Sequence, residues 1–153
     1  MADDVLHILI IDAPYYAEIT AELLAGATAV LDDAGVTYER ISVPGVFEIP
    51  AALSMASLSG DMGHRDYDGY ILLGCVIRGE TSHYDIVANE SARALQDLAV
   101  SEALAVGNGI LTVDNADQAW ARAKRDQKNK GRDAAEAALR MAQLRREMGV
   151  TEI

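Results

Sequence analysis

Two nearly unbroken apolar runs dominate the chain, VLHILIID at 5–12 and GYILLGCVI at 69–77. Leucine-type and β-branched residues without polar alternation are typical of strands that are covered on both faces in a parallel sheet. Neither run approaches the roughly 20 residues that a membrane helix needs. The two runs therefore predict central strands of a buried sheet.

Helical patterns separate these runs. The segment 17–34 places its apolar residues at helical spacing, and Gly35 follows as a stop signal. The alanine-rich segment 49–58 tolerates Pro50 because proline fits the first turn of a helix. The remaining elements predicted from the pattern are strands at 38–43 and 105–112 and helices at 84–101, 116–124 and 131–148.

Strands that alternate with helices are joined as parallel neighbours by right-handed crossovers. The order predicts one α/β domain over 1–153, a three-layer α/β/α sandwich with a four-stranded parallel sheet. In such sheets ligands bind beyond the carboxyl ends of the strands. A ligand site is therefore expected among the loops at 12–16, 43–48, 77–83 and 112–115.

Composition excludes several classes of function. A net charge of −11 would repel a phosphate backbone, so nucleic acid is not an expected partner. The single cysteine and three scattered histidines give no zinc spacing, so no metal is expected. The chain opens without a basic stretch before an apolar one, which favours a cytoplasmic protein with no membrane partner.

The segment 74–85 (GCVIRGETSHYD) carries the most chemistry, because a buried strand ends there and a helix begins. Gly79 permits a tight turn, and Thr81 or Ser82 can cap the helix, whose free N–H groups suit an anion. His83 is the one histidine at a strand's carboxyl end, and imidazole suits proton transfer near neutral pH. The alternative is that Thr81 only caps the helix and His83 is a surface residue.

Basic residues gather between 122 and 132, which holds more than a third of the thirteen in the chain. Most such runs are solvated helix faces, and that alternative stays open here. The turn Asn129–Gly131 favours a binding role, because it fixes Lys130 at the junction of two helices.

Aromatic residues follow the first two predicted strands. Phe47 and Glu48 lie between two prolines, and Tyr15 and Tyr16 follow the first strand. Phe47 could belong to the core, Glu48 could serve the helix dipole, and the tyrosines could pack structurally or offer a flat face to a heterocycle. The residues alone indicate an α/β enzyme that binds a small phosphorylated compound.

Five motifs together resemble the lumazine synthase (6,7-dimethyl-8-ribityllumazine synthase) family: GVFEIP at 45–50, GCVIRGETSHYD at 74–85, GILT at 109–112, QAWARA at 118–123 and NKG at 129–131. They occur in order and with compatible spacing from about residue 8 to about residue 145. Each motif alone is weak, whereas the combination is highly specific. The resemblance implies a flavodoxin-like fold.

The resemblance also implies a transferase of riboflavin biosynthesis that uses no metal or organic cofactor. Its two small-molecule substrates would be 5-amino-6-ribitylaminouracil and 3,4-dihydroxy-2-butanone 4-phosphate, and its products 6,7-dimethyl-8-ribityllumazine, phosphate and water. The implied assembly is a homo-oligomer, a pentamer with active sites shared between adjacent subunits.

The resemblance assigns roles residue by residue. His83 matches the general acid and base, and Asp133 matches a carboxylate that orients the arginine. The residues matched to the phosphate are Glu80, Thr81, Arg122 and Lys130. The residues matched to the uracil and ribityl groups are Tyr15, Val46, Phe47, Glu48 and Asn108, with Tyr15 stacking on the heterocycle.

Three positions depart from the family's common pattern. Tyr16 stands where an asparagine is frequent, Asn108 where a phenylalanine is frequent, and 124–128 lacks the glycines common before NKG. We expect an isolated pentamer, because little sequence precedes the first strand.

Two other functions compete with this interpretation of the sequence. One is a catalytically weak flavin- or lumazine-binding paralogue, and the other is a flavodoxin-like electron carrier. The retention of His83, Arg122 and Lys130 disfavours the first, because a pure binding protein needs no proton-transfer group. The second would need a phosphate loop rich in Ser, Thr and Gly, which 12–16 does not supply.

Overall fold

The sheet is the centre of the molecule. A computed structural model of the chain describes residues 5–59 and 66–150. In this part of the chain four strands form one sheet in the order β2-β1-β3-β4, and all three pairings are parallel. The strands are β1 His7–Asp12, β2 Thr37–Ser42, β3 Gly69–Ile77 and β4 Val106–Val113. The predicted four-stranded parallel sheet is confirmed.

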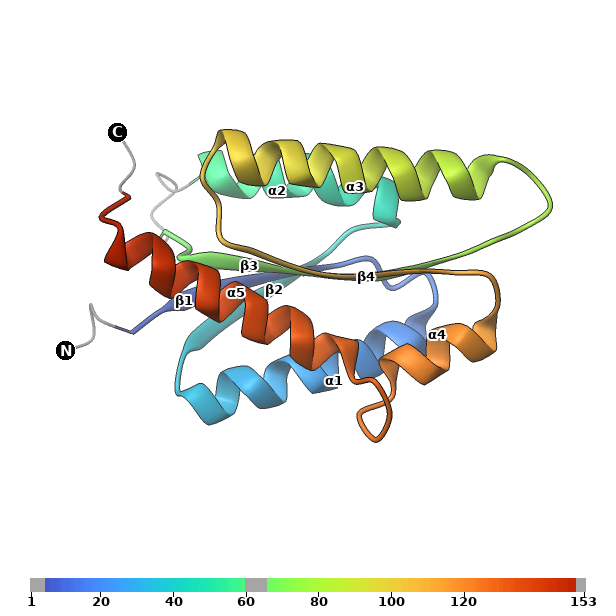
Figure 1. The fold of residues 1–153 in the computed structure, drawn as a ribbon, viewed down its shortest axis with the longest axis horizontal. Helices are drawn as coiled ribbons and strands as arrows, with labels where there is room; N and C mark the ends of the chain where they lie inside the picture. Colours follow the sequence, from blue (N-terminus) through green and yellow to red (C-terminus); the bar gives the residue numbers. More distant parts are fainter. Residues whose placement is uncertain (1–4, 60–65, 151–153) are drawn as a thin grey trace.

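Helices cover both faces of this sheet (Figure 1). One face carries α1 Ala17–Ala34, α4 Ala116–Ala123 and α5 Lys130–Glu147, and the other carries α2 Ile49–Leu58 and α3 His83–Ser101. A short 3₁₀ turn, η2 Val46–Glu48, leads into α2. This arrangement is the predicted three-layer sandwich. Among the described residues, none of the helices has the length and apolarity to cross a membrane.

Each apolar strand supplies side chains to two separate cores, because successive residues of a strand point to opposite faces. Ile8 and Ile10 pack with α1 and α5, whereas Leu9 and Ile11 pack with α2 and α3. All four are at most 1% exposed. Burial on both faces explains why the strand shows no polar alternation in sequence.

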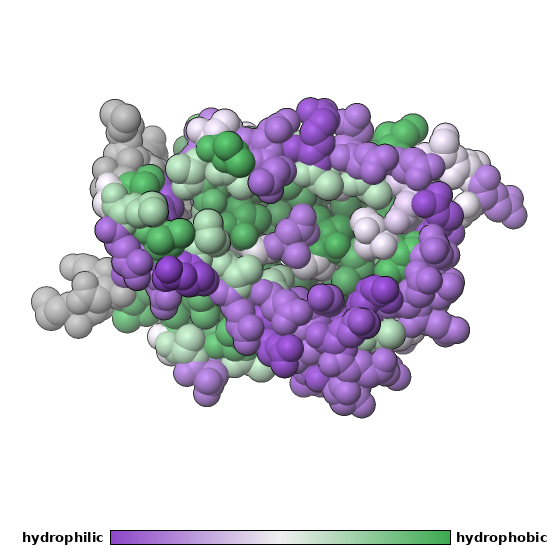
Figure 2. All heavy atoms as spheres, viewed as in Figure 1, coloured by the Kyte–Doolittle hydropathy of each residue, from purple (hydrophilic) through white to green (hydrophobic). Residues whose placement is uncertain are grey.

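The two edge strands differ from the central pair. β2 is exposed along most of its length, and β4 alternates between buried and exposed residues. The outer edge of β4 lies between α3 and α5 (Figure 1). In the same view, Figure 2 shows a recessed band of apolar residues between two hydrophilic rims. This recess is a surface that the described chain leaves open.

The junction between α4 and α5 is shaped by Asn129 rather than by its glycine. Asn129 adopts a left-handed conformation, with φ of 48°. Gly131 lies against α1, where a Cβ at this position would collide with the carbonyl of Leu23. The tight turn predicted at Asn129–Gly131 is therefore present, and Gly131 serves the close approach of two helices. Lys130 begins α5, as the turn predicts.

Candidate active site

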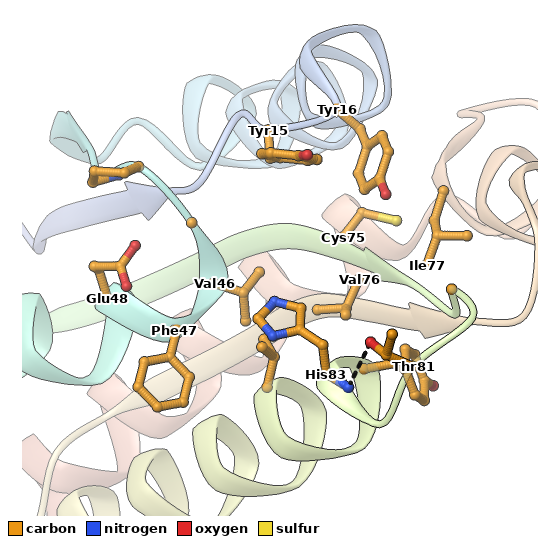
Figure 3. Close-up of a pocket in the computed structure, with 15 residues that line it drawn as sticks. Tyr15, Tyr16, Val46, Phe47, Glu48, Cys75, Val76, Ile77, Thr81 and His83 are labelled. Atoms are coloured by element: carbon orange, nitrogen blue, oxygen red, sulfur yellow. Dashed lines mark hydrogen bonds between the residues drawn. The ribbon is translucent and has the colours of Figure 1, made fainter.

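A cavity of about 440 Å³ opens beyond the carboxyl ends of β1 and β3 (Figure 3). Its size is within the usual range for small-molecule sites. Three of the four predicted loops contribute to it, those at 12–16, 43–48 and 77–83. The lining residues are Tyr15, Tyr16, Pro44, Gly45, Val46, Phe47, Glu48, Cys75, Val76, Ile77, Gly79, Thr81, His83, Tyr84 and Val87. We call this cavity the main pocket.

Two aromatic side chains stand at the opening of the main pocket. Tyr15 is 74% exposed and Phe47 is 53% exposed. The exposure of Phe47 shows that the interpretation of this residue as core is wrong. Exposed aromatic rings provide flat surfaces for a planar ligand.

A buried carboxylate holds the two loops that carry these aromatic rings. Asp12 ends β1 and is 0% exposed. It accepts hydrogen bonds from Arg40 Nε at 2.6 Å and from Ser42 Oγ at 2.5 Å. A buried charge is tolerated when it is paired and hydrogen-bonded in this way. Asp12 therefore ties the loop after β1 to the end of β2, a role that the sequence did not reveal.

His83 is the first residue of α3, and its imidazole points into the main pocket toward Val46 (Figure 3). The backbone N–H of His83 donates to Thr81 Oγ1 at 3.3 Å. Ser82 occupies the cap position but makes no side-chain cap. Of the two predicted capping residues, it is Thr81 that satisfies a free N–H of the helix.

Arg78 fixes the base of the loop that carries Thr81. Its Nε donates to Asp114 at 3.1 Å and its Nη1 to Asp85 at 3.3 Å, and its guanidinium lies 4.2 Å from the centroid of the Tyr84 ring. These partners, the Asp114 hydrogen bond first, raise the pKa of Arg78. The positive charge of Arg78 is thus paired with Asp85 of α3 and with Asp114 after β4.

The floor of the main pocket is apolar. Cys75, Val76 and Ile77, the last residues of β3, form it. Sequence reasoning did not single them out as site residues. Their position at the carboxyl end of a buried strand is the signal that could have identified them.

Burial raises the pKa of the Cys75 thiol to about 11, so the thiol stays protonated through the neutral range. We expect native protein at pH 7.5 to resist iodoacetamide, which attacks thiolates, and unfolded protein to react readily. Mass spectrometry gives a direct measurement, because Cys75 is the only cysteine. Native alkylation as fast as that of protein in guanidinium would contradict the burial argument.

The other predicted site residues lie elsewhere. Asn108, Arg122, Lys130 and Asp133 line a second hollow of about 370 Å³, formed by β4, α4 and the start of α5. None of its lining residues belongs to the main pocket. Glu80, in the loop between Gly79 and Thr81, is exposed and lines neither hollow. The predicted residues other than Glu80 therefore fall into two separate groups on the chain, one at each hollow.

Side chains in the second hollow have partners of their own. Arg122 Nη1 donates to the carbonyl of Gln118 at 3.0 Å, and Lys130 Nζ lies 3.5 Å from Asp133 Oδ2. Asp133 also pairs with Arg132 at 3.3 Å. Among the described residues no hydrogen bond or ion pair joins Arg122 to Asp133, so the orientation of Arg122 by Asp133 stays a prediction. Asn108 Oδ1 accepts a hydrogen bond from the N–H of Ile110.

Part of the basic cluster at 122–132 is structural. Arg125 donates to Glu22 Oε1 through its backbone N–H and through Nε, both at 3.0 Å. The backbone hydrogen bond is the main cause of the lowered pKa of Glu22. Arg125 therefore joins α1 to the segment after α4, and Arg122 and Lys130 are the basic residues that line the second hollow.

In the described part of the chain no three His, Cys, Asp or Glu side chains lie where they could share a metal ion.

Comparison with known proteins identifies the family. The sequence profile of 6,7-dimethyl-8-ribityllumazine synthase matches residues 5–146. The chain is 58% identical to 6,7-dimethyl-8-ribityllumazine synthase 1 of Rhizobium meliloti, over 94% of each chain. It is 55% identical to the synthase of Agrobacterium fabrum, over 94% of this chain and 97% of the relative, and 57% identical to that of Bartonella bacilliformis, over 94% and 92%. The chain therefore belongs to the 6,7-dimethyl-8-ribityllumazine synthase family, whose members are transferases.

Proposed function

We propose that the chain condenses 5-amino-6-ribitylaminouracil with 3,4-dihydroxy-2-butanone 4-phosphate to 6,7-dimethyl-8-ribityllumazine, phosphate and water. The observation that carries this proposal is the main pocket, where aromatic rings, a loop with free N–H groups and one imidazole meet in a single cavity. The aromatic rings suit a heterocycle, the free N–H groups suit an anion, and the imidazole suits proton transfer.

Tyr15 and Phe47 would hold the aminouracil at the opening of the main pocket. Tyr15 offers its exposed face for stacking, and Phe47 and Glu48 come from the turn before α2. Val46 and Asn108 complete the predicted contacts to the uracil and ribityl groups. The phosphate of the second substrate would lie at Glu80 and Thr81, where the start of α3 presents backbone N–H groups.

In the proposed mechanism, the primary amine of the aminouracil attacks the ketone, and loss of water gives an imine. A base removes the proton on C3 as phosphate leaves C4 with the C–O bond pair, and the resulting enol tautomerises to a ketone. The second amine attacks this ketone and closes the ring with loss of another water. His83 would carry protons between these steps, because it is the imidazole that reaches the main pocket. Holding two substrates together contributes further, since orientation can lower a barrier by roughly 7 to 11 kcal/mol in the best cases.

The two separate hollows favour a homo-oligomer. Arg122 and Lys130 line a hollow separate from that of Thr81, so a phosphate bound by all three residues would need a second copy of the chain. The recess along β4 offers an apolar surface for that copy (Figure 2). We propose a head-to-tail ring, a pentamer, in which each subunit's second hollow completes its neighbour's main pocket. A cytoplasmic location stays a prediction from the sequence.

The test is to mix purified protein with both substrates and to follow lumazine by absorbance and fluorescence. Product that forms faster than in the protein-free mixture is the expected result. Tight binding of the aminouracil without faster product would instead support the alternative, a flavin- or lumazine-binding paralogue. Protein with neither binding nor turnover would contradict both.

A further inference from the structure

Tyr16 is a pocket residue for which the proposed reaction has no role so far. It is half-buried, and its ring packs against the core beneath α1. Its backbone carbonyl accepts the hydrogen bond from the N–H of Thr20 that starts this helix. Backbone and ring are both held in place, so the hydroxyl has a defined position in the main pocket.

The hydroxyl of Tyr16 points over Cys75, toward the apolar floor of the main pocket (Figure 3). None of the hydrogen bonds found among the described residues involves this hydroxyl, and its neighbours in the pocket are Tyr15 and Cys75. Burial is the first cause that raises the pKa of Tyr16, so the phenol stays neutral at working pH and can both donate and accept. A polar group placed in this way suits a polar atom of the ligand.

The angle between the two tyrosine rings indicates which part of the ligand the Tyr16 hydroxyl would contact. Tyr15 and Tyr16 meet edge to face, with ring centroids 5.0 Å apart and planes at 81°. In Figure 3 the Tyr15 ring turns its edge toward Tyr16, so a planar ring stacked parallel to Tyr15 would also turn its edge toward Tyr16. Hydrogen bonds to ring carbonyl and N–H groups lie close to the ring plane. In Figure 3 the Tyr16 hydroxyl extends beyond the level of the Tyr15 ring, toward Cys75 and the floor of the pocket.

We infer that Tyr16 is a specificity-determining residue whose hydroxyl hydrogen-bonds the carbonyl and N–H edge of the pyrimidinedione ring stacked on Tyr15. This inference rests on the proposed function, because it takes the aminouracil as the ligand of the main pocket. The inference assigns the Tyr16 hydroxyl to the aminouracil and not to the butanone phosphate. The butanone phosphate has no planar ring to place between Tyr15 and the floor.

The test compares wild type with Tyr16→Phe, which removes only the hydroxyl. A matched control is Tyr38→Phe, because the Tyr38 hydroxyl donates to Asp32 at 3.0 Å outside the pocket. Calorimetry measures the Kd of 5-amino-6-ribitylaminouracil without the second substrate, and steady-state kinetics measure both KM values and kcat. We expect Tyr16→Phe to raise the Kd and KM of the aminouracil about fivefold to tenfold. The KM of the butanone phosphate should stay within about twofold, and the control should match wild type.

Each other outcome overturns the inference. Equal aminouracil affinity in wild type and Tyr16→Phe would show that the hydroxyl does not contact the ring, even if wild type makes lumazine. A rise confined to the KM of the butanone phosphate would place the hydroxyl at the other substrate. Wild type that does not bind the aminouracil would overturn the inference and the proposed function together. Circular dichroism of the variant checks that the fold is retained.

Discussion

Replacement of His83 with alanine is expected to lower kcat about a hundredfold, because a positioned proton-transfer group contributes on the order of 10²–10⁴ in rate. Substrate affinity should change little. Thr81 Oγ1 accepts a hydrogen bond from the backbone N–H of residue 83, and an alanine at this position keeps that N–H. The loop that would hold the phosphate is therefore preserved while the imidazole is lost.

The matched control for this variant is Ser82→Ala. Ser82 is exposed, and its side chain makes no capping hydrogen bond at the start of α3. Single-turnover kinetics at saturating substrate separate the chemical steps from product release. A His83→Ala protein with the wild-type single-turnover rate would remove His83 from the mechanism. An equal loss of rate in Ser82→Ala would show that the effect comes from a change in the loop structure and not from the missing imidazole.

Local patterns were sufficient to predict most of the fold. The bounds of α1, α2 and β3 agree with the predictions at 17–34, 49–58 and 69–77. Each of these elements is delimited by signals within a few residues, such as Gly35 after α1 and Pro50 in the first turn of α2. The other elements differ by one or two residues at their ends, where fraying makes the boundary ambiguous. The turn η2 was missed, because three residues show no period.

The site could be predicted only in part, because it depends on long-range placement. The rule for carboxyl ends of strands identified the loops of Tyr15, Phe47 and His83, and these loops meet in the main pocket. The sequence does not show that β4 lies at the edge of the sheet, and this placement separates Arg122 and Lys130 from the pocket. The resemblance, by contrast, implied a shared site. The buried contact of Asp12 with Arg40 was also hidden, since their pairing depends on the register of β1 and β2.

Replacement of Arg122 with alanine is expected to raise the KM of the butanone phosphate about tenfold to a hundredfold, since hydrogen bonds to charged groups contribute roughly 1.5–3 kcal/mol. Arg122 Nη1 donates to the carbonyl of Gln118, which leaves the rest of its guanidinium for an anion. Arg140→Ala is the matched control, because Arg140 pairs with Glu147 along α5. A wild-type KM in Arg122→Ala would contradict the phosphate assignment.

The proposed shared site leads to a further prediction for the same two variants. In a head-to-tail ring, His83 of one subunit works with Arg122 of its neighbour, so each mutation damages a different half of the shared site. Refolding equal amounts of His83→Ala and Arg122→Ala chains together should then restore both halves at about one quarter of the interfaces. The mixture should show about a quarter of wild-type activity at a butanone phosphate concentration below the KM of Arg122→Ala. Activity no higher than the mean of the two separate variants would mean that each chain holds a complete site, and the second hollow would lose its role.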